Sequence, residues 1–226
     1  MPKIKSSAAW LLKNARKDLF LAKLEELRSP RKVRPVVTRS GHRARGYFPS
    51  RKAERARYES LLELDALKIQ EVAPCILEVR THPLVLALPE GATPVHYTPD
   101  MVVLTETAGA VIEVKSQFFL AQLAQRVRLA KVAQLLAEQG LPFVVMTEGD
   151  IRDRALLDEL DTLLAARPVP GRYIPLGDAE AWDPRGRQQP TEELQRRWQA
   201  AKEECDALLQ RVMRRPPGEV LEQFQP

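Results

Sequence analysis

Two short apolar runs separated by a turn constrain the fold more than any other feature of the sequence. Met101–Leu104 reads MVVL and Gly109–Lys115 reads GAVIEVK, and both are rich in β-branched residues. A third run, PFVVMT at 142–147, follows a stretch of helical spacing over about Leu120–Gln139. Short apolar runs that alternate with helices are typical of strands in a sheet covered by helices. The sequence therefore predicts an α/β fold, with a mixed sheet flanked by helices.

Apolar residues at helical spacing and turn-bounded apolar stretches predict the other elements. Helices are expected over Ser7–Arg28, Ala53–Ile69, Ile151–Ala166 and Thr191–Arg215, and irregular or short strands over Val72–Leu88 and Arg172–Leu176. Asp150 is expected to cap the helix that follows it. Composition then divides the chain into a basic helical arm and loop at 1–52, a main domain at 53–176, and a C-terminal linker and helix at 177–226 that we expect to bind a partner.

The distribution of charge is strongly uneven. Residues 1–57 hold 17 Lys or Arg and 4 Asp or Glu, a net charge of +13, whereas the remainder has a net charge of −8. Such a basic arm is typical of contact with a polyanion such as double-stranded DNA. No apolar run reaches the roughly 18 residues of a transmembrane helix. We therefore expect a cytoplasmic protein without membrane contact.

Acidic and basic side chains stand at the ends of the two central strands. Asp100 precedes the first run directly, and Val114 separates Glu113 from Lys115 in the second. Side chains two residues apart on a strand point to the same face, so Glu113 and Lys115 project together while Val114 turns into the core. If the strands pair, Asp100 lies beside them. Burying charge costs several kcal/mol unless it is paired or binds a metal, so the pattern predicts a divalent-metal site.

Oxygen ligands around hard cations suit two-metal phosphoryl chemistry. Asp100, Glu113 and the backbone carbonyl of Val114 are the predicted ligands, and Lys115 would orient a water molecule and stabilise charge on the phosphate. A further acid is expected from the preceding helix. Glu63 is the first choice because it follows an apolar pair, and Glu59, one turn earlier, is the second.

These residues also resemble a known family. PD followed by ExK across two strands is the pattern of the PD-(D/E)xK superfamily. The longer order of SRKAERARYESLLELDAL, YTPDMVVL, GAVIEVK, a helix and PFVVMTEGDIR resembles TnsA, the endonuclease subunit of heteromeric transposases. The resemblance covers roughly Thr38–Arg154. The family's catalytic positions fall on Glu63, Asp100, Glu113 and Lys115. His82–Pro83 stands where relatives often have Gln-Pro, which leaves the role of that position open.

The resemblance implies a restriction-endonuclease-like fold and a Mg²⁺-dependent endonuclease with two metal ions per site, in which Mn²⁺ can substitute. Its substrate would be the 5′ ends of a transposon in cut-and-paste transposition. Its partners would be a TnsB-like DDE transposase and a TnsC-like AAA+ ATPase, in a bacterial cytoplasm and at the nucleoid when active. Two alternatives stay open: a stand-alone restriction or repair nuclease, and a non-catalytic DNA-binding scaffold subunit.

Several basic and polar side chains are candidates for DNA contact, although each of them also fits a solvated surface. The candidates are Arg39, Arg43, Arg45, Lys52, Gln122, Arg128 and Lys131. The acids also have simpler interpretations, because Asp100 can be a turn residue and Glu113 and Lys115 an exposed ion pair. The three histidines form no cluster in the sequence, so we expect core or surface roles for them: His42, His82 and His96.

Overall fold

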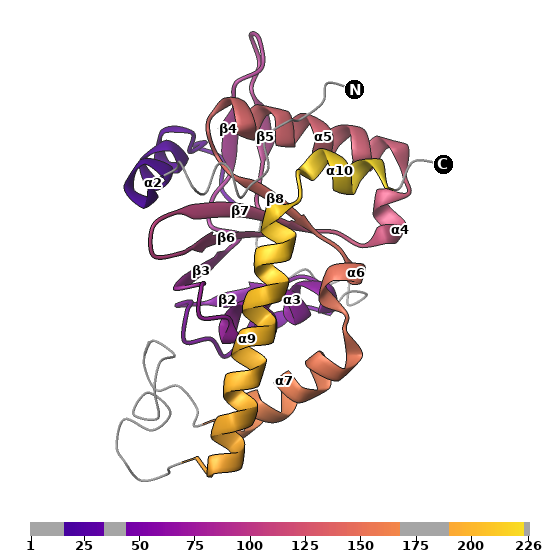
Figure 1. Ribbon diagram of the computed structural model, residues 1–226. Helices are drawn as coiled ribbons and strands as arrows, with labels where there is room; N and C mark the ends of the chain where they lie inside the picture. The colour runs from indigo at the N-terminus through magenta and orange to yellow at the C-terminus, as the bar shows by residue number, and fades with distance from the viewer. Residues whose placement is uncertain (1–15, 34–43, 168–189, 224–226) are drawn as a thin grey trace.

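A four-stranded mixed sheet forms the centre of the protein (Figure 1). The computed structural model describes residues 16–33, 44–167 and 190–223. The strands lie in the order β3 (Glu78–Thr81), β6 (Met101–Leu104), β7 (Gly109–Val114) and β8 (Phe143–Met146). β3 pairs antiparallel with β6 and β6 antiparallel with β7, whereas β8 runs parallel to β7. The expected mixed α/β architecture is confirmed.

Helices cover both faces of this sheet, as the apolar character of its strands requires. Every residue of β6, β7 and β8 is buried. Two consecutive parallel strands need a crossover connection between them. Helix α5 (Leu123–Glu138) forms this connection between β7 and β8. The strands predicted from their β-branched runs are therefore present at the expected positions.

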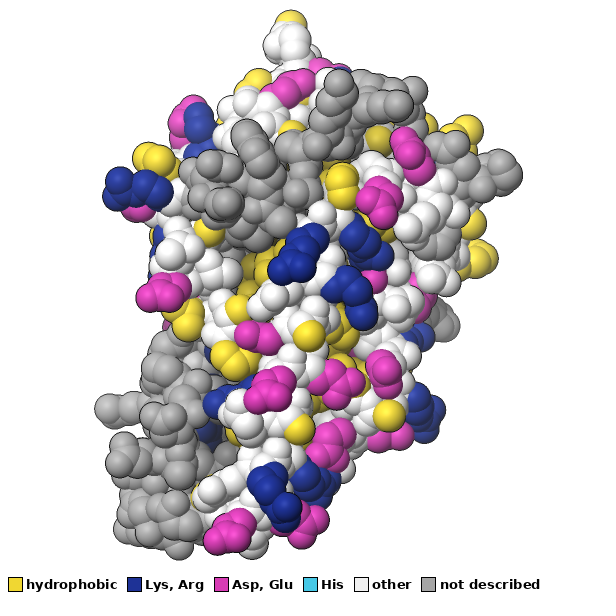
Figure 2. Space-filling view, viewed as in Figure 1, with side chains coloured by type: hydrophobic (Ala, Val, Ile, Leu, Met, Phe, Trp, Pro, Cys, Tyr) yellow, Lys and Arg dark blue, Asp and Glu magenta, His cyan; other side chains and the backbone are white. Residues whose placement is uncertain are grey.

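Two apolar cores result, one on each face (Figure 1). The first lies between the sheet and the helices α3 (Leu61–Val72), α7 (Arg154–Ala166) and α9 (Glu192–Arg214). The second lies between the sheet and the helices α2 (Lys17–Glu26), α5 and α10 (Pro217–Glu222). The described part of the C-terminal extension thus contributes to both cores of the fold. Its outer surface, which Figure 2 shows, carries acidic and basic side chains interspersed along α9.

Short elements complete the structure. They are the two-stranded sheets β1 (Gly46–Phe48) with β2 (Ala56–Tyr58) and β4 (Leu86–Leu88) with β5 (Val95–Tyr97), and the single-turn helices α4 (Gln117–Leu120) and α6 (Glu148–Ile151). None of the described helices has the length and apolar character that crossing a membrane requires.

Two helix starts differ from the prediction. The helix expected from Ala53 begins at Leu61, because the chain before it forms β2 and Ser60 caps the helix by accepting a hydrogen bond from the Glu63 amide at 3.1 Å. Asp150 does not cap the helix that follows it: it lies inside the short helix α6, whose N-cap is Thr147, and its carboxylate accepts a hydrogen bond from the Thr147 amide at 2.9 Å. Asp153 caps α7 instead, by accepting a hydrogen bond from the Leu156 amide.

The other boundaries are close to the prediction. Thr191 caps α9 as expected. The expected irregular segment at 72–88 contains the ordered strands β3 and β4. The helix expected over Ser7–Arg28 is present as α2 from Lys17 to Glu26, because Arg16 before it is extended. The residues before Arg16 and the strand expected at Arg172–Leu176 lie outside the described residues.

A buried charged network fixes the segment before α3 and excludes one of the DNA-binding candidates. The Lys52 ammonium donates to the Gln70 and Ala73 carbonyls at 2.9 and 2.5 Å, at the C-terminal end of α3. With 4% of its surface exposed, Lys52 cannot reach a phosphate from this position. The prediction that Lys52 contacts DNA is therefore wrong for this conformation, because its charge satisfies helix carbonyls instead.

Candidate functional site

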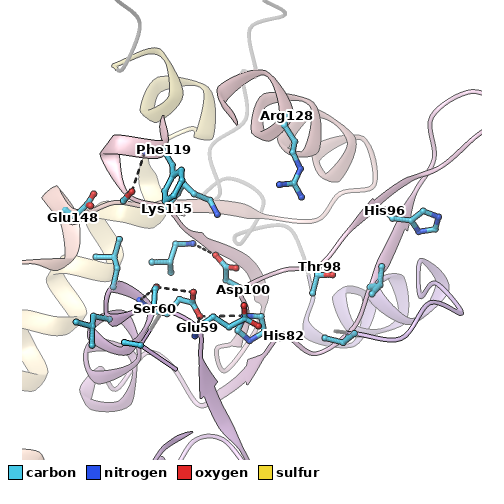
Figure 3. A pocket seen from close by; sticks show the side chains of 18 of the residues that line it. Glu59, Ser60, His82, His96, Thr98, Asp100, Lys115, Phe119, Arg128 and Glu148 are labelled. Atoms are coloured by element: carbon cyan, nitrogen blue, oxygen red, sulfur yellow. Dashed lines mark hydrogen bonds and ion pairs between the residues drawn. The ribbon is translucent and has the colours of Figure 1, made fainter. Parts of the chain in front are cut away.

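A cavity of about 850 Å³ opens where the first turn of α3 faces the adjoining ends of β6 and β7. Acidic, basic and imidazole side chains share its lining, and Figure 3 shows how they converge from different elements. Three of the four predicted catalytic side chains line it, namely Glu63, Asp100 and Lys115, and Glu113 lies directly behind Lys115. The strand ends therefore meet as the sequence analysis expected.

Glu63 is held by the start of its own helix. Its carboxylate accepts hydrogen bonds from the Glu59 amide at 2.8 Å and the Ser60 hydroxyl at 3.1 Å. Ser60 in turn accepts from the Glu63 amide, so the side chain and backbone hold one another in the manner of a capping box. This S-x-x-E signal fixes a buried carboxylate at the cavity wall. The second-choice acid, Glu59, also lines the cavity.

Asp100 is positioned by the pairing of the two central strands. Met101 pairs with Ile112, which brings the preceding residue beside the end of β7. Asp100 Oδ2 accepts a hydrogen bond from the Val114 amide at 2.8 Å, and its backbone carbonyl accepts one from the His82 amide at 2.9 Å. Asp100 is thus held through its carboxylate by β7 and through its backbone by His82, directly after β3. The carboxylate faces the cavity (Figure 3).

Glu113 and Lys115 form an ion pair, as their spacing predicted. Lys115 Nζ lies 2.8 Å from Glu113 Oε1, while the Tyr97 hydroxyl donates to Glu113 Oε2 at 2.7 Å. Glu113 is 3% exposed and has both oxygens engaged. Its carboxylate therefore positions the lysine in this structure, and Lys115 is the member of the pair that reaches the cavity.

His82 joins Glu63 and Asp100 as a possible metal ligand, a role that the sequence did not predict for it. One nitrogen of its ring and one oxygen from each of Glu63 and Asp100 all lie within 4.8 Å of one another. We call these three residues the donor cluster. His82 is 7% exposed and follows β3 directly, with a positive φ of 45°. Its role could not be foreseen because it depends on the pairing of β3 with β6.

The electrostatics of the donor cluster favour a bound cation. Burial raises the pKa of Glu63, and burial together with the charge of Glu113 raises the pKa of Asp100 well above its usual range. Burial also lowers the pKa of His82, so its ring is favoured in the neutral, ligating form. A divalent cation would offset the cost of ionising both carboxylates. The donor types and their surroundings fit such an ion.

Lys115 behaves differently from the carboxylates. Burial disfavours its charged form, but Glu113 and Asp100 outweigh this effect and raise its pKa. It is therefore a cation near neutral pH. A fixed positive charge beside a cavity stabilises an anionic oxygen that enters it.

The candidates for DNA contact occupy several environments. Arg128 and Gln122 are exposed on or next to α5, and Arg128 lines the cavity. Lys131 forms an ion pair with Glu90, and Arg45 is partly buried. Arg39 and Arg43 lie outside the described residues. Three further basic side chains line the cavity without having been predicted: Arg31, Lys32 and Arg152.

Tyr97 is a second residue that sequence analysis missed. It lies within the YTPDMVVL stretch and is fully buried, with its ring packed edge-on against Phe143 at 6.1 Å. Burial, followed by the charge of Glu113, raises its pKa well above the usual value, so the hydroxyl stays a hydrogen-bond donor. The strand alternation around it offered a signal for burial but none for its partner.

No protein-family model matches the sequence, and a search of curated proteins finds no match.

Proposed function

We propose that this protein is a metal-dependent DNA endonuclease that hydrolyses phosphodiester bonds. The observation that carries the proposal is the convergence of Glu63 and Asp100, two carboxylates with raised pKa, beside the cationic Lys115 in one open cavity. Carboxylates suit Mg²⁺ or Mn²⁺, and a fixed cation suits an anionic phosphate. Other hydrolases use such carboxylates, but a cavity rimmed by arginine and lysine favours a polyanionic substrate.

Each side chain of the site has a role in this reaction. Glu63 and Asp100 would hold the divalent cation, which when bound supplies Lewis-acid polarisation of a phosphate oxygen and a lowered pKa of water. Lys115 donates to a non-bridging oxygen and stabilises the charge that develops there. Glu113 keeps the lysine charged and aimed at the cavity. The Tyr97 hydroxyl orients Glu113 in turn.

The basic rim supports double-stranded DNA as the substrate. Arg31, Lys32 and Arg128 line the cavity and come from two separate parts of the chain. Basic side chains at such positions contact phosphates and set the register of a duplex without reading its sequence. The N-terminal excess of positive charge extends the same property beyond the cavity.

The finer part of the proposal is a TnsA-like role with a restriction-endonuclease-like fold. It rests on the quoted sequence resemblance and is supported by the element order of helix α3, strands β6 and β7, helix α5 and strand β8. In that role the enzyme cuts the 5′ ends of a transposon together with a TnsB-like transposase and a TnsC-like ATPase. It would work in the bacterial cytoplasm, at the nucleoid when active.

Cleavage by an Asp100→Asn variant tests the catalytic proposal. With the transposase and ATPase partners present, we expect wild-type protein to cut duplex DNA in Mg²⁺ or Mn²⁺, and the variant to lose at least roughly a hundredfold in rate, because the lost charge weakens the metal site. Glu106→Gln, in the exposed turn between β6 and β7, is the matched control and should cut normally. Unchanged cleavage by the Asp100→Asn protein would overturn the mechanism.

Dependence on partners tests the finer role. A TnsA-like enzyme should cut transposon ends only when its transposase and ATPase are present. Cleavage of any duplex by the protein alone would favour the stand-alone nuclease, and partner assembly without cleavage would favour the scaffold subunit.

A further inference from the structure

The His82 side chain has a buried nitrogen with no assigned role. The side chain is 8% exposed, and Nδ1 has no hydrogen-bond partner among the described residues. A buried polar atom without a partner costs about 1–3 kcal/mol. Figure 3 shows His82 in the same corner of the cavity as Asp100. One cation cannot bind both ring nitrogens, and it is Nε2 that lies 3.6 Å from Glu63 Oε2, within reach of a shared ion.

The backbone holds His82 in place for such a ligand. Its φ of 45° lies in the left-handed region, which costs a residue other than glycine on the order of 1 kcal/mol unless its surroundings enforce it. The His82 amide donates to the Asp100 carbonyl at 2.9 Å, and the preceding residue, Thr81, pairs with Met101. The backbone of His82 is thus hydrogen-bonded to the backbone of Asp100, whose carboxylate belongs to the donor cluster.

The distances within the donor cluster fit one ion. Two ligand atoms that bind a cation at about 2.1 Å lie no more than roughly 4.2 Å apart. His82 Nε2 and Glu63 Oε2 are 3.6 Å apart, too far for a hydrogen bond and close enough to share a metal. The three donor atoms lie within 4.8 Å of one another, so small side-chain rotations bring them all into range.

We propose that His82 is a direct ligand of the cation held by Glu63 and Asp100, and that this mixed donor set makes the site prefer Mn²⁺ to Mg²⁺. The inference rests on the proposed function, whose site it shares. Mg²⁺ selects oxygen ligands and keeps its waters, whereas Mn²⁺ stands in the series of transition metals that accept imidazole nitrogen. Glu113, with both oxygens engaged by Tyr97 and Lys115, is left to position the lysine.

Pulsed electron paramagnetic resonance of the Mn²⁺-loaded full chain tests the proposal directly. A coordinated imidazole gives a nitrogen modulation of the Mn²⁺ signal, and we expect this modulation in the wild-type protein. It should disappear in His82→Asn, a residue that tolerates positive φ. His96→Asn, which changes another cavity-lining histidine outside the donor cluster, should keep it. Thermal melting of each variant confirms that it folds.

Metal titration gives an independent measure. By calorimetry the Kd for Mn²⁺ should rise at least about tenfold in His82→Asn, whereas the Kd for Mg²⁺ should change little. In one possible result, wild-type protein binds Mn²⁺ without nitrogen modulation and Asp100→Asn does not bind Mn²⁺. This result would overturn the role of His82 and leave the nuclease proposal standing. Modulation that persists in His82→Asn would also overturn it. No Mn²⁺ binding in wild type would overturn both proposals.

Discussion

Lys115 is held in position, and partly kept charged, by residues that do not line the cavity. Glu113 lies behind it at 2.8 Å, and the Tyr97 hydroxyl holds the other carboxylate oxygen at 2.7 Å. A lysine in a partly buried position keeps its proton only if carboxylates compensate for the lost water. The chain from Tyr97 through Glu113 to Lys115 therefore determines how well the positive charge is placed at the cavity wall.

Tyr97→Phe tests this chain without changing any charge. The variant loses one hydrogen bond to a buried carboxylate, so we expect the free energy of unfolding to fall by about 1.5–3 kcal/mol in urea denaturation. The rate of DNA cleavage should also fall, because Glu113 gains freedom to rotate. Tyr47→Phe is the control, since Tyr47 is exposed, and it should change stability by less than about 0.5 kcal/mol. Equal stability of the two variants would contradict the assigned role.

The residue pairs that the sequence predicts differ from those it misses in a physical way. Glu113 and Lys115 lie two apart on one strand, and strand geometry alone puts them on one face. Glu63 was predicted from the apolar pair before it, and its capping contact with Ser60, three residues earlier, is a local signal of the same kind that the prediction did not use. His82 and Tyr97 reach their partners only through strand pairing across longer loops. Their roles require the register of the sheet, which no local pattern contains.

At the scale of elements, buried charges join the start and the end of α3 to the rest of the fold. Glu71 accepts hydrogen bonds from the Ser50 hydroxyl at 2.6 Å and the Arg51 amide at 2.7 Å. Arg167, after α7, pairs with the same carboxylate at 2.6 Å and also donates to the Pro49 carbonyl. The helix that supplies Glu63 to the site is thereby fixed at its far end.

Arg167→Ala should destabilise the protein far more than the loss of a surface ion pair. Removing one partner of a buried pair leaves the other uncompensated, which costs about 3–5 kcal/mol. The control is Arg197→Ala, which breaks the half-exposed pair with Glu159 and should cost less than about 1 kcal/mol. Urea unfolding of both variants measures the difference. A similar small loss in both would show that the network adds no stability.

Lys52 gives the stability of the protein a predictable pH dependence. Burial lowers its pKa from 10.5 to about 8, although the charge of Glu71 opposes this effect. Between these values the unfolded chain binds more protons than the folded chain, so this residue's contribution to stability rises with pH. The full gain corresponds to roughly 3 kcal/mol. It should be complete once pH exceeds the pKa of the unfolded lysine.

A Lys52→Met variant isolates this contribution. Urea unfolding of both proteins at several values between pH 7 and about 11 should show wild type gaining stability relative to the variant as pH rises. Below pH 8 the difference should be constant, because the lysine is then charged in both states. A difference that stays constant over the whole range would mean that the folded lysine titrates normally.

The predicted positions of helices and strands agree with the structure where short-range sequence signals are strong. The β-branched runs became β6, β7 and β8, which are buried throughout. The residues before α3 have good helix formers, yet they form β2 because Arg51 and Lys52 are buried against other parts of the chain. Tertiary contacts override propensity in such short segments. β1 and β4 have only three residues each, too few for a periodic signal.

The whole molecule combines an acidic body with a basic N-terminal quarter. The net charge of +13 over residues 1–57 belongs to the part of the chain that supplies Arg31 and Lys32 to the cavity rim. Acidic and basic side chains are mixed along α9, and its last turn carries Arg211 and Arg214 (Figure 2). The charge asymmetry along the chain favours a polyanion at the basic N-terminal quarter.

The salt dependence of DNA binding measures this asymmetry. Each phosphate neutralised by a basic side chain adds about 0.9 to the slope of log K against log salt concentration. Lys32→Ala and Arg128→Ala should therefore each weaken binding to any duplex and reduce the slope by about one. Arg211→Ala, on the exposed side of α9 and outside the cavity lining, should leave both unchanged. Fluorescence anisotropy with a labelled duplex at several salt concentrations gives the slopes. If Arg211→Ala lowered the slope as much as Arg128→Ala, DNA would have to bind across α9, and the cavity rim would lose its assigned role.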